Sequence, residues 1–135
     1  MRIQGTVQDG VGDASFWLDK YSELYRSWTG DPVYPGSLNL AIAEKFDWCD
    51  PRVESHKRIH SLVPHGGNRD ICLVPCRIFA NERAGISGFA WATTNAAHDP
   101  EYKVLEIIAP TRLRDELQIT NGSVVTIDIP IEWPE

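Results

Sequence analysis

Short apolar segments recur along the whole chain, separated by turns rich in glycine, proline and asparagine. Segments of this length, several with strict alternation, are typical of strands. They predict seven or eight strands, at residues 2–8, 15–18, 38–42, 58–63, 70–79, 86–93, 102–109 and 123–129. The strands do not alternate with helices as a doubly wound parallel sheet requires. The pattern therefore favours a mainly β fold, a small barrel with short helices covering its ends.

Two segments outside these strands have helical patterns. Residues 20–28 carry apolar side chains at the spacing of one helical face: Tyr21, Leu24, Tyr25 and Trp28. We interpret this stripe as core rather than as a cofactor contact. A second, shorter helix is expected after Pro110, because proline is favoured in the first turn of a helix.

Length and charge limit the possible classes of protein. A chain of 135 residues is long enough for one ordinary domain, which we expect to span residues 1–135. It has no apolar run long enough for a membrane span and no apolar N-terminal segment typical of a signal peptide, so we expect a cytoplasmic protein. The formal net charge of −6 argues against a nucleic-acid-binding surface. The oligomeric state is left open.

The cysteines and histidines do not have the spacing of a common metal site. Cys72 and Cys76 are separated by three residues rather than two, and even spacing places both on one face of a strand. We expect them to pack in the core. The loop histidines lack a neighbouring cysteine or carboxylate at a ligand spacing, so we expect them to be solvated: His56, His60 and His65.

The segment YPGSLNL, residues 34–40, predicts a tight turn that leads into an alternating strand. Pro35 fixes its own φ, and Gly36 permits a positive φ. In the strand, Leu38 and Leu40 point to one face. The hydroxyl of Ser37 and the amide of Asn39 point to the other face. This segment alone is compatible with an ordinary turn or with a binding site.

Two further features have both a structural and a functional interpretation. The loop after the first strand, residues 9–14, contains two glycines that could bring backbone N–H groups close to a ligand, or could simply form a hairpin turn. Glu106 interrupts an otherwise apolar strand. It is either on the solvent face of that strand or held there for a purpose.

Four segments, in this order and at these distances, resemble the archaeal CTP-dependent riboflavin kinases. GTVQDGVGD at residues 5–13 resembles the family's G-x-V-x-S-G-x-G-E, and YPGSLNL at residues 34–40 resembles Y-x-G-T-L-N-L. VPCRI at residues 74–78 resembles an apolar strand ending in P-x-[RK]-I. LEIIAPTRLR at residues 105–114 resembles [IL]-E-[VI]-I-A-P-x-x-L-R, followed by Asn-Gly where the family has Asp-Gly.

The resemblance implies a six-stranded cradle-loop β-barrel with two or three short helices. It implies transfer of the γ-phosphoryl group of CTP to the 5′-hydroxyl of riboflavin, giving FMN and CDP, with Mg²⁺ as cofactor. The implied metal ligands are Ser37 and Asn39, and the implied flavin contacts are Thr94 and Glu106. The implied nucleotide-binding residues are Gly10, Val11, Gly12, Asp13, Ala14, Ser15, Thr111, Arg112, Leu113 and Arg114.

Several positions depart from the family pattern. Ser37 stands where threonine is usual, Ala14 replaces a glycine, and Asp9 adds a negative charge where serine is usual. His98 occupies the position of a flavin-contacting threonine, so Thr94 or its neighbour Thr93 is expected to take that role. These departures motivate an alternative, a nucleotide- or flavin-binding barrel without kinase activity. A DNA-binding relative is a third hypothesis, which the net charge disfavours.

Overall fold

The computed structural model describes residues 1–10, 14–83 and 85–129. The strands of the described chain are β1 (Arg2–Gln8), β2 (Leu38–Ala41), β3 (Arg58–Ser61), β4 (Asp70–Phe79), β5 (Ile86–Thr93), β6 (Val104–Ile108) and β7 (Val124–Asp128). Its helices are α1 (Ala14–Lys20), α2 (Ser22–Thr29), α3 (Pro51–Glu54), α4 (Thr94–His98), α5 (Leu113–Glu116) and the short 3₁₀ helix η1 (Val63–His65).

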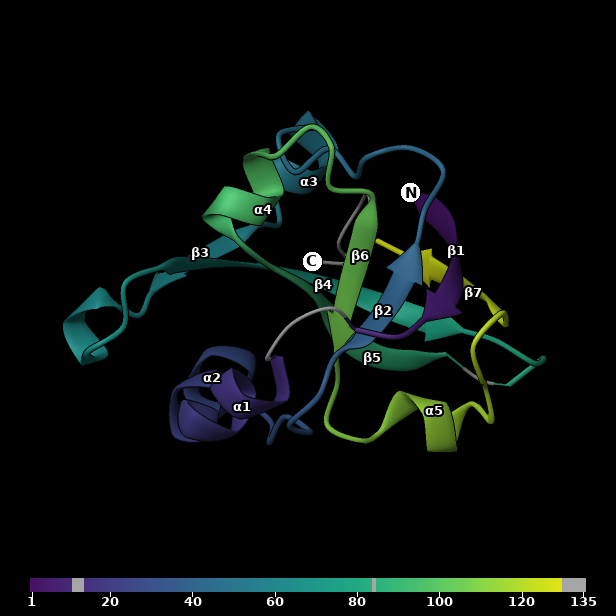
Figure 1. Cartoon of the computed structure of the whole chain (residues 1–135), viewed down its shortest axis with the longest axis horizontal. Coiled ribbons are helices and arrows are strands. Elements are labelled where there is room, and N and C mark those ends of the chain that lie inside the picture. The colour runs from purple at the N-terminus through teal and green to yellow at the C-terminus, as the bar shows by residue number, and fades with distance from the viewer. Residues whose placement is uncertain (11–13, 84, 130–135) are drawn as a thin grey trace.

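Six of these strands close into an antiparallel barrel, and β3 lies outside it (Figure 1). The strand order is β3-β4-β5-β6-β2-β1-β7, and β7 returns to pair with the far half of β4, from Arg77↔Asp128 to Phe79↔Thr126. The near half of β4 pairs with β3, from Arg58↔Leu73 to Ser61↔Asp70. The expected six-stranded barrel is therefore confirmed, with one additional outer strand.

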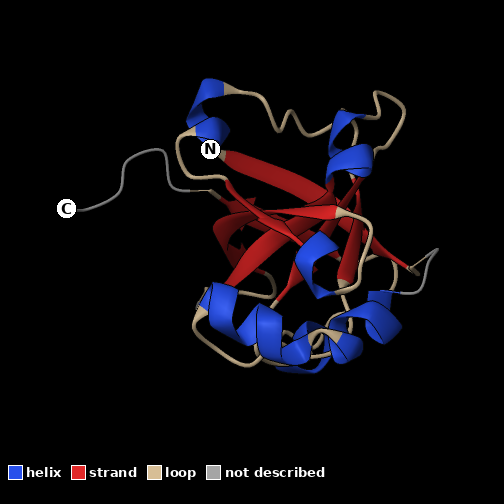
Figure 2. Cartoon of the chain, turned by 90° about the vertical axis from the view of Figure 1, so that its left-hand side faces the viewer, coloured by secondary structure: helices blue, strands red, loops and turns tan. Residues whose placement is uncertain are grey.

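Two apolar clusters hold the barrel and its helices together. The larger cluster fills the barrel interior, and residues of α3 and α5 close the barrel at opposite ends. The smaller cluster lies on the outer face of β4, β5 and β6, beneath α1 and α2. Figure 2 shows the resulting layers, with strands between two groups of helices. The outer cluster matters for function, because it lies beside the candidate site.

The pairing of β4 leaves room for a proline inside the strand. Pro75 pairs with Phe89 of β5 on one side. On its other side β4 pairs with β3 only through Leu73 and with β7 only from Arg77, so Pro75 lies between the two partners. A residue without a backbone N–H is tolerated there because no second strand needs that donor.

Three α-helices were not predicted from the sequence. Residues 15–18 form part of α1 instead of a strand, and α3 and α4 form in segments for which no helix was expected. Helix α1 buries Leu18 against the sheet and leaves Phe16 and Trp17 exposed, a one-sided burial that three consecutive apolar residues do not reveal. The N-terminus of α4 is capped by Thr93, whose hydroxyl accepts a hydrogen bond from the backbone N–H of Ala96.

The expected core roles of other residues are confirmed. Cys72 and Cys76 are both buried in the barrel cluster, and burial raises the pKa of the Cys76 thiol to about 12. Tyr21 and Tyr25 of the helical stripe are buried in the outer cluster. The ring of His60 is not simply solvated, because it stacks on Trp28 with the ring centroids 4.6 Å apart.

Candidate functional site

A row of polar and aromatic side chains crosses the outer face of the barrel. The strand registers pair Gln8 with Asn39, Asn39 with Glu106, and Glu106 with Trp91. On the opposite face, Leu38 and Leu40 are buried in the barrel interior, as the alternation predicted. The register therefore brings Asn39 and Glu106, which are 67 positions apart in the sequence, next to each other on one surface.

The turn at residues 34–36 leads the chain into β2 and so onto this surface. The sequence suggested a positive φ at Gly36, but Gly36 does not have one. Among the described glycines only Gly30, Gly66 and Gly122 have positive φ. The Gly36 N–H instead donates to the Tyr34 carbonyl oxygen at 2.8 Å, which closes a three-residue turn. A Cβ atom at Gly36 would lie 3.1 Å from Cε1 of the Tyr34 ring, so glycine is favoured here by close approach.

The carboxylate of Glu106 is held by two hydroxyl groups. Tyr102 Oη donates to Oε2 at 2.9 Å, and Ser37 Oγ donates to Oε1 at 3.3 Å. Burial raises the pKa of Glu106, and the two hydrogen bonds partly oppose that effect. The sequence reasoning missed Tyr102. Its even spacing from Glu106 in an extended segment was the available signal, since residues i and i+4 share a strand face.

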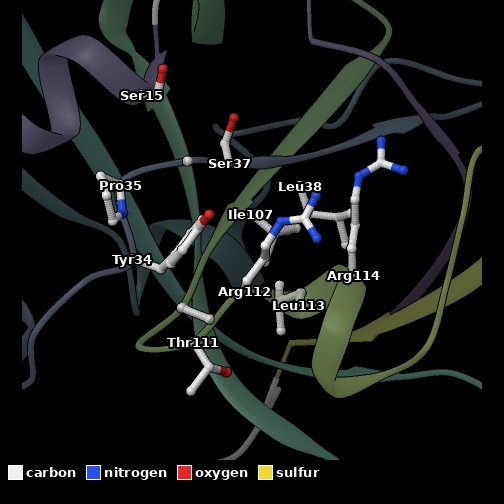
Figure 3. A pocket seen from close by; sticks show the side chains of 12 residues that line it. Ser15, Tyr34, Pro35, Ser37, Leu38, Ile107, Thr111, Arg112, Leu113 and Arg114 are labelled. Atoms are coloured by element: carbon white, nitrogen blue, oxygen red, sulfur yellow. The ribbon is translucent and has the colours of Figure 1, made fainter.

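A first cavity, of about 240 Å³, opens between the turn before β2 and the start of α5 (Figure 3). Six of the residues predicted to bind nucleotide or metal line it: Ser15, Ser37, Thr111, Arg112, Leu113 and Arg114. Tyr34, Pro35, Gly36, Leu38 and Ile107 also line it. The cavity is thus open, polar and flanked by two guanidinium groups.

Both guanidinium groups at this cavity are fixed by carboxylate or amide partners. Arg112 donates to Asp115 at 2.7 Å. Arg114 donates to Asn121 Oδ1 at 2.8 Å and to the Gln8 carbonyl oxygen at 3.2 Å. Asn121 in turn donates to Asp9 at 2.9 Å. The negative charge of Asp9 is therefore part of a chain that restrains Arg114.

A second cavity, of about 600 Å³, lies between the outer face of the sheet, α1 and α2, and the β3–β4 hairpin. Its aromatic lining residues are Trp17, Tyr21, Tyr25, Trp91 and Tyr102. Trp91 Nε1 donates to Tyr25 Oη at 2.8 Å, which fixes two of the aromatic side chains. This volume and this lining suit a flat aromatic ligand.

The two cavities adjoin at two places. Ala14 lines the second cavity and the next residue, Ser15, lines the first. Ser37 lines the first and Glu106 lines the second, and a hydrogen bond joins their side chains. A group bound in one cavity could therefore reach a group bound in the other near Ser37 and Glu106.

The remaining predicted site residues lie as follows. Gly10 packs against Asn39, since a Cβ at Gly10 would lie 2.9 Å from Asn39 Nδ2. Val11, Gly12 and Asp13 fall outside the described residues. Of the two threonines considered as flavin contacts, Thr93 lines the second cavity and Thr94 is not among its lining residues.

The side chains near the junction of the cavities that could bind a metal ion offer mainly oxygen atoms as ligands. Asn39 uses Nδ2 to donate to the Ser37 carbonyl oxygen at 3.3 Å, so its Oδ1 is the atom available to a cation. The Ser37 hydroxyl and the Glu106 carboxylate lie beside it. Within the described residues, no three His, Cys, Asp or Glu side chains gather as a metal cluster. These hard oxygen atoms are of the kind that Mg²⁺ prefers.

Comparison with known families identifies the domain. Residues 7–129 match a family whose description is "Domain of unknown function DUF120" and whose short name is CTP-dep_RFKase, for CTP-dependent riboflavin kinase. The chain belongs to this family. The four sequence motifs and both cavities lie largely within the matched region, so the resemblance seen in the sequence is confirmed.

Proteins named riboflavin kinase are similar over nearly the whole chain. The one from Methanobrevibacter smithii is 30% identical over 130 residues, covering 95% of this chain and 99% of the relative. Those from Archaeoglobus fulgidus and Pyrococcus abyssi are each 29% identical and cover 96% and 94% of this chain. The chain spans little more than half the length of these two relatives, 54% and 58%. No helix among the described residues could cross a membrane.

Proposed function

We propose that this protein is a CTP-dependent riboflavin kinase, which transfers the γ-phosphoryl group of CTP to the 5′-hydroxyl of riboflavin to give FMN and CDP. The observation that carries the proposal is the junction of two cavities of different chemistry at Ser37 and Glu106. One cavity is polar and cationic, as a nucleotide requires. The other is large and aromatic, as a flavin ring requires.

The nucleotide is assigned to the first cavity. Arg112 and Arg114 bring positive charge to it, and Ser15 lines it from the start of α1. Guanidinium groups that are already held by Asp115 and Asn121 need little reorganisation before they bind phosphate oxygens. Preference for CTP over other nucleotides is inferred from the family name and is part of the proposal.

The flavin is assigned to the second cavity, with its ribityl chain directed toward Glu106. The Glu106 carboxylate can accept a hydrogen bond from a ribityl hydroxyl, and Tyr102 and Ser37 keep it oriented. Thr93 also lines this cavity, where the sequence had suggested Thr93 or Thr94. The 5′-hydroxyl at the end of the ribityl chain would then lie near the junction with the first cavity.

Ser37 and Asn39 are the residues that would hold Mg²⁺, through Oγ and Oδ1. A bound Mg²⁺ would neutralise charge on the β- and γ-phosphates of the nucleotide. Ser37 and Asn39 are neutral, so we expect the ion to bind together with the nucleotide, which supplies most of the negative charge. Gly10, which packs against Asn39, lies at the same point.

The chemistry needs positioning more than covalent assistance. The 5′-hydroxyl oxygen forms the new bond to the γ-phosphorus, the bond from that phosphorus to the β–γ bridging oxygen breaks, and the hydroxyl proton is released. The protein contributes by aligning the two substrates across the junction and by placing Arg112 and Arg114 near the phosphates.

The test is a direct assay of product formation. The purified chain is incubated with riboflavin, Mg²⁺ and either CTP or ATP, and FMN is separated by chromatography. We expect FMN with CTP and much less with ATP. Absence of FMN with every nucleoside triphosphate would reject the proposal, and calorimetric binding of CDP or riboflavin without product would then support the alternative of a non-catalytic barrel.

A further inference from the structure

The β3–β4 hairpin forms one wall of the aromatic cavity. Figure 1 shows this hairpin extending beyond the barrel, with α1 and α2 on one side of it. Its turn contributes Leu62 and residues 66–69 to the cavity lining. The turn is closed by two hydrogen bonds, from the Leu62 N–H to the Arg69 carbonyl oxygen and from the Gly67 N–H to the Leu62 carbonyl oxygen, both 2.9 Å long.

This wall is packed closely against the helices. A Cβ at Gly67 would lie 2.6 Å from Leu62 Cβ and 3.2 Å from Tyr21 Oη. Glycine is therefore needed for the turn to approach Tyr21, the residue between α1 and α2. Because the turn is fixed in this way, the residue that follows it, Arg69, is held at the edge of the cavity.

Two cations at this cavity have no carboxylate partner among the described residues. Arg69 and Lys20 both line the cavity, and neither lies within 4.0 Å of an Asp or Glu oxygen there. The Lys20 ammonium lies over the rings of Trp17 and Tyr21, at 5.2 and 5.5 Å from their centroids. Both positive charges are thus available to a ligand.

The strand registers separate Arg69 from Glu106. Glu106 on β6 pairs with Trp91 on β5, and Ile71 on β4, two residues after Arg69, pairs with Thr93 on β5. Two interstrand spacings, about 10 Å, therefore lie between the strand of Glu106 and the strand that Arg69 precedes. Glu106 and Arg69 therefore line the cavity from different strands, so that a carboxylate and a cation without a carboxylate partner lie on separate parts of its wall.

We infer that Arg69, assisted by Lys20, binds the electronegative carbonyl edge of the flavin ring and so sets the orientation of the riboflavin substrate. The ring has two carbonyl groups at its pyrimidine end and two methyl groups at its other end. Cations without partners favour the carbonyl end, since methyl groups offer no hydrogen-bond acceptor. This inference rests on the proposed function, because it assigns riboflavin to this cavity.

The test uses lumiflavin, a flavin ring without the ribityl chain, which cannot be phosphorylated. Quenching of its fluorescence by the tryptophan and tyrosine side chains reports binding to the full chain. We expect Arg69→Ala to raise its Kd about tenfold, consistent with loss of a hydrogen bond from a charged donor, and Arg69→Lys to retain much of the affinity. Arg83→Ala, which removes an exposed arginine in the β4–β5 turn, is the matched control and should bind normally.

The orientation is tested with N3-methyl-lumiflavin, in which a methyl group blocks the carbonyl edge. The methyl group should weaken binding to the wild type about tenfold, and binding to Arg69→Ala less than threefold, because the contact is already absent. Equal losses in both proteins, or a normal lumiflavin Kd for Arg69→Ala, would overturn the inference. Arginine-dependent binding of lumiflavin without formation of FMN from riboflavin would instead reject the kinase proposal and leave this contact in place.

Discussion

Replacing Asn39 with alanine tests whether this residue binds the metal ion or only stabilises the fold, because the two roles predict different effects on activity and on stability. Asn39 is 8% exposed, and its side chain makes one long hydrogen bond, 3.3 Å from Nδ2 to the Ser37 carbonyl oxygen. Loss of that bond and of the contact with Gly10 should lower the free energy of unfolding by about 1 kcal/mol. For a domain of this size the melting temperature should fall by about 4 °C, and the protein should remain folded.

The expected effect on activity is much larger than the effect on stability. If Asn39 Oδ1 is a ligand of the metal that accompanies CTP, its loss should lower kcat/KM about 100-fold, which corresponds to about 2.7 kcal/mol of transition-state stabilisation. Asn39→Asp keeps an oxygen ligand and adds charge. We expect this variant to reach half-maximal activity at a lower Mg²⁺ concentration than Asn39→Ala.

Gln8→Ala is the matched control, because Gln8 is the direct cross-strand neighbour of Asn39 on the same row. It removes a similar amide side chain from a position that we do not assign to metal binding. The assay is FMN formation across a range of Mg²⁺ concentrations, with thermal unfolding measured in parallel. A kcat/KM for Asn39→Ala within twofold of the Gln8→Ala value would refute the assignment.

Three further predictions address the two cavities and the hairpin. Tyr102→Phe removes the 2.9 Å hydrogen bond to Glu106 and should raise the KM for riboflavin about fivefold; an equal rise in the KM for CTP would contradict a role confined to the flavin side. Asp9→Ala should raise the KM for CTP only about two- to fivefold, because this exposed residue restrains Arg114 through Asn121; tighter CTP binding would show that Asp9 repels the phosphates. Burial, and secondarily Arg58, lowers the pKa of His60, so the folded state binds fewer protons there than the unfolded state. Stability should therefore be lost as the pH falls below about 6.5, and His60→Phe should reduce that loss in urea unfolding at pH 7 and pH 5; an unchanged acid slope would argue against it.

Much of the barrel could be predicted from local patterns. The alternation in residues 38–41 correctly placed Leu38 and Leu40 inside and Asn39 on the outer face, because side chains along a strand point alternately to opposite faces. The even spacing of Cys72 and Cys76 likewise predicted their burial. The order and spacing of the four motifs were sufficient to indicate the family.

Local sequence patterns did not predict the structure correctly where only one side of a segment is buried, or where its conformation depends on neighbouring residues. The start of α1 looked like a strand because Phe16, Trp17 and Leu18 are consecutive apolar residues, yet only Leu18 packs against the sheet. The turn at Gly36 closes through a backbone hydrogen bond to Tyr34 rather than a positive φ. Neither outcome is determined by the residues of the segment alone, since each depends on what lies beside it.

The sequence by itself determined most of the strands, the buried face of residues 38–41, and which residue types were available for binding. Only the tertiary structure decided that β7 pairs with β4, that Asn39 lies opposite Glu106, and that a hairpin turn brings Arg69 to an aromatic cavity. The physical reason is that alternation and turn preference act over a few residues. The register between strands far apart in the chain is instead set by the closure of the barrel and the packing of its core.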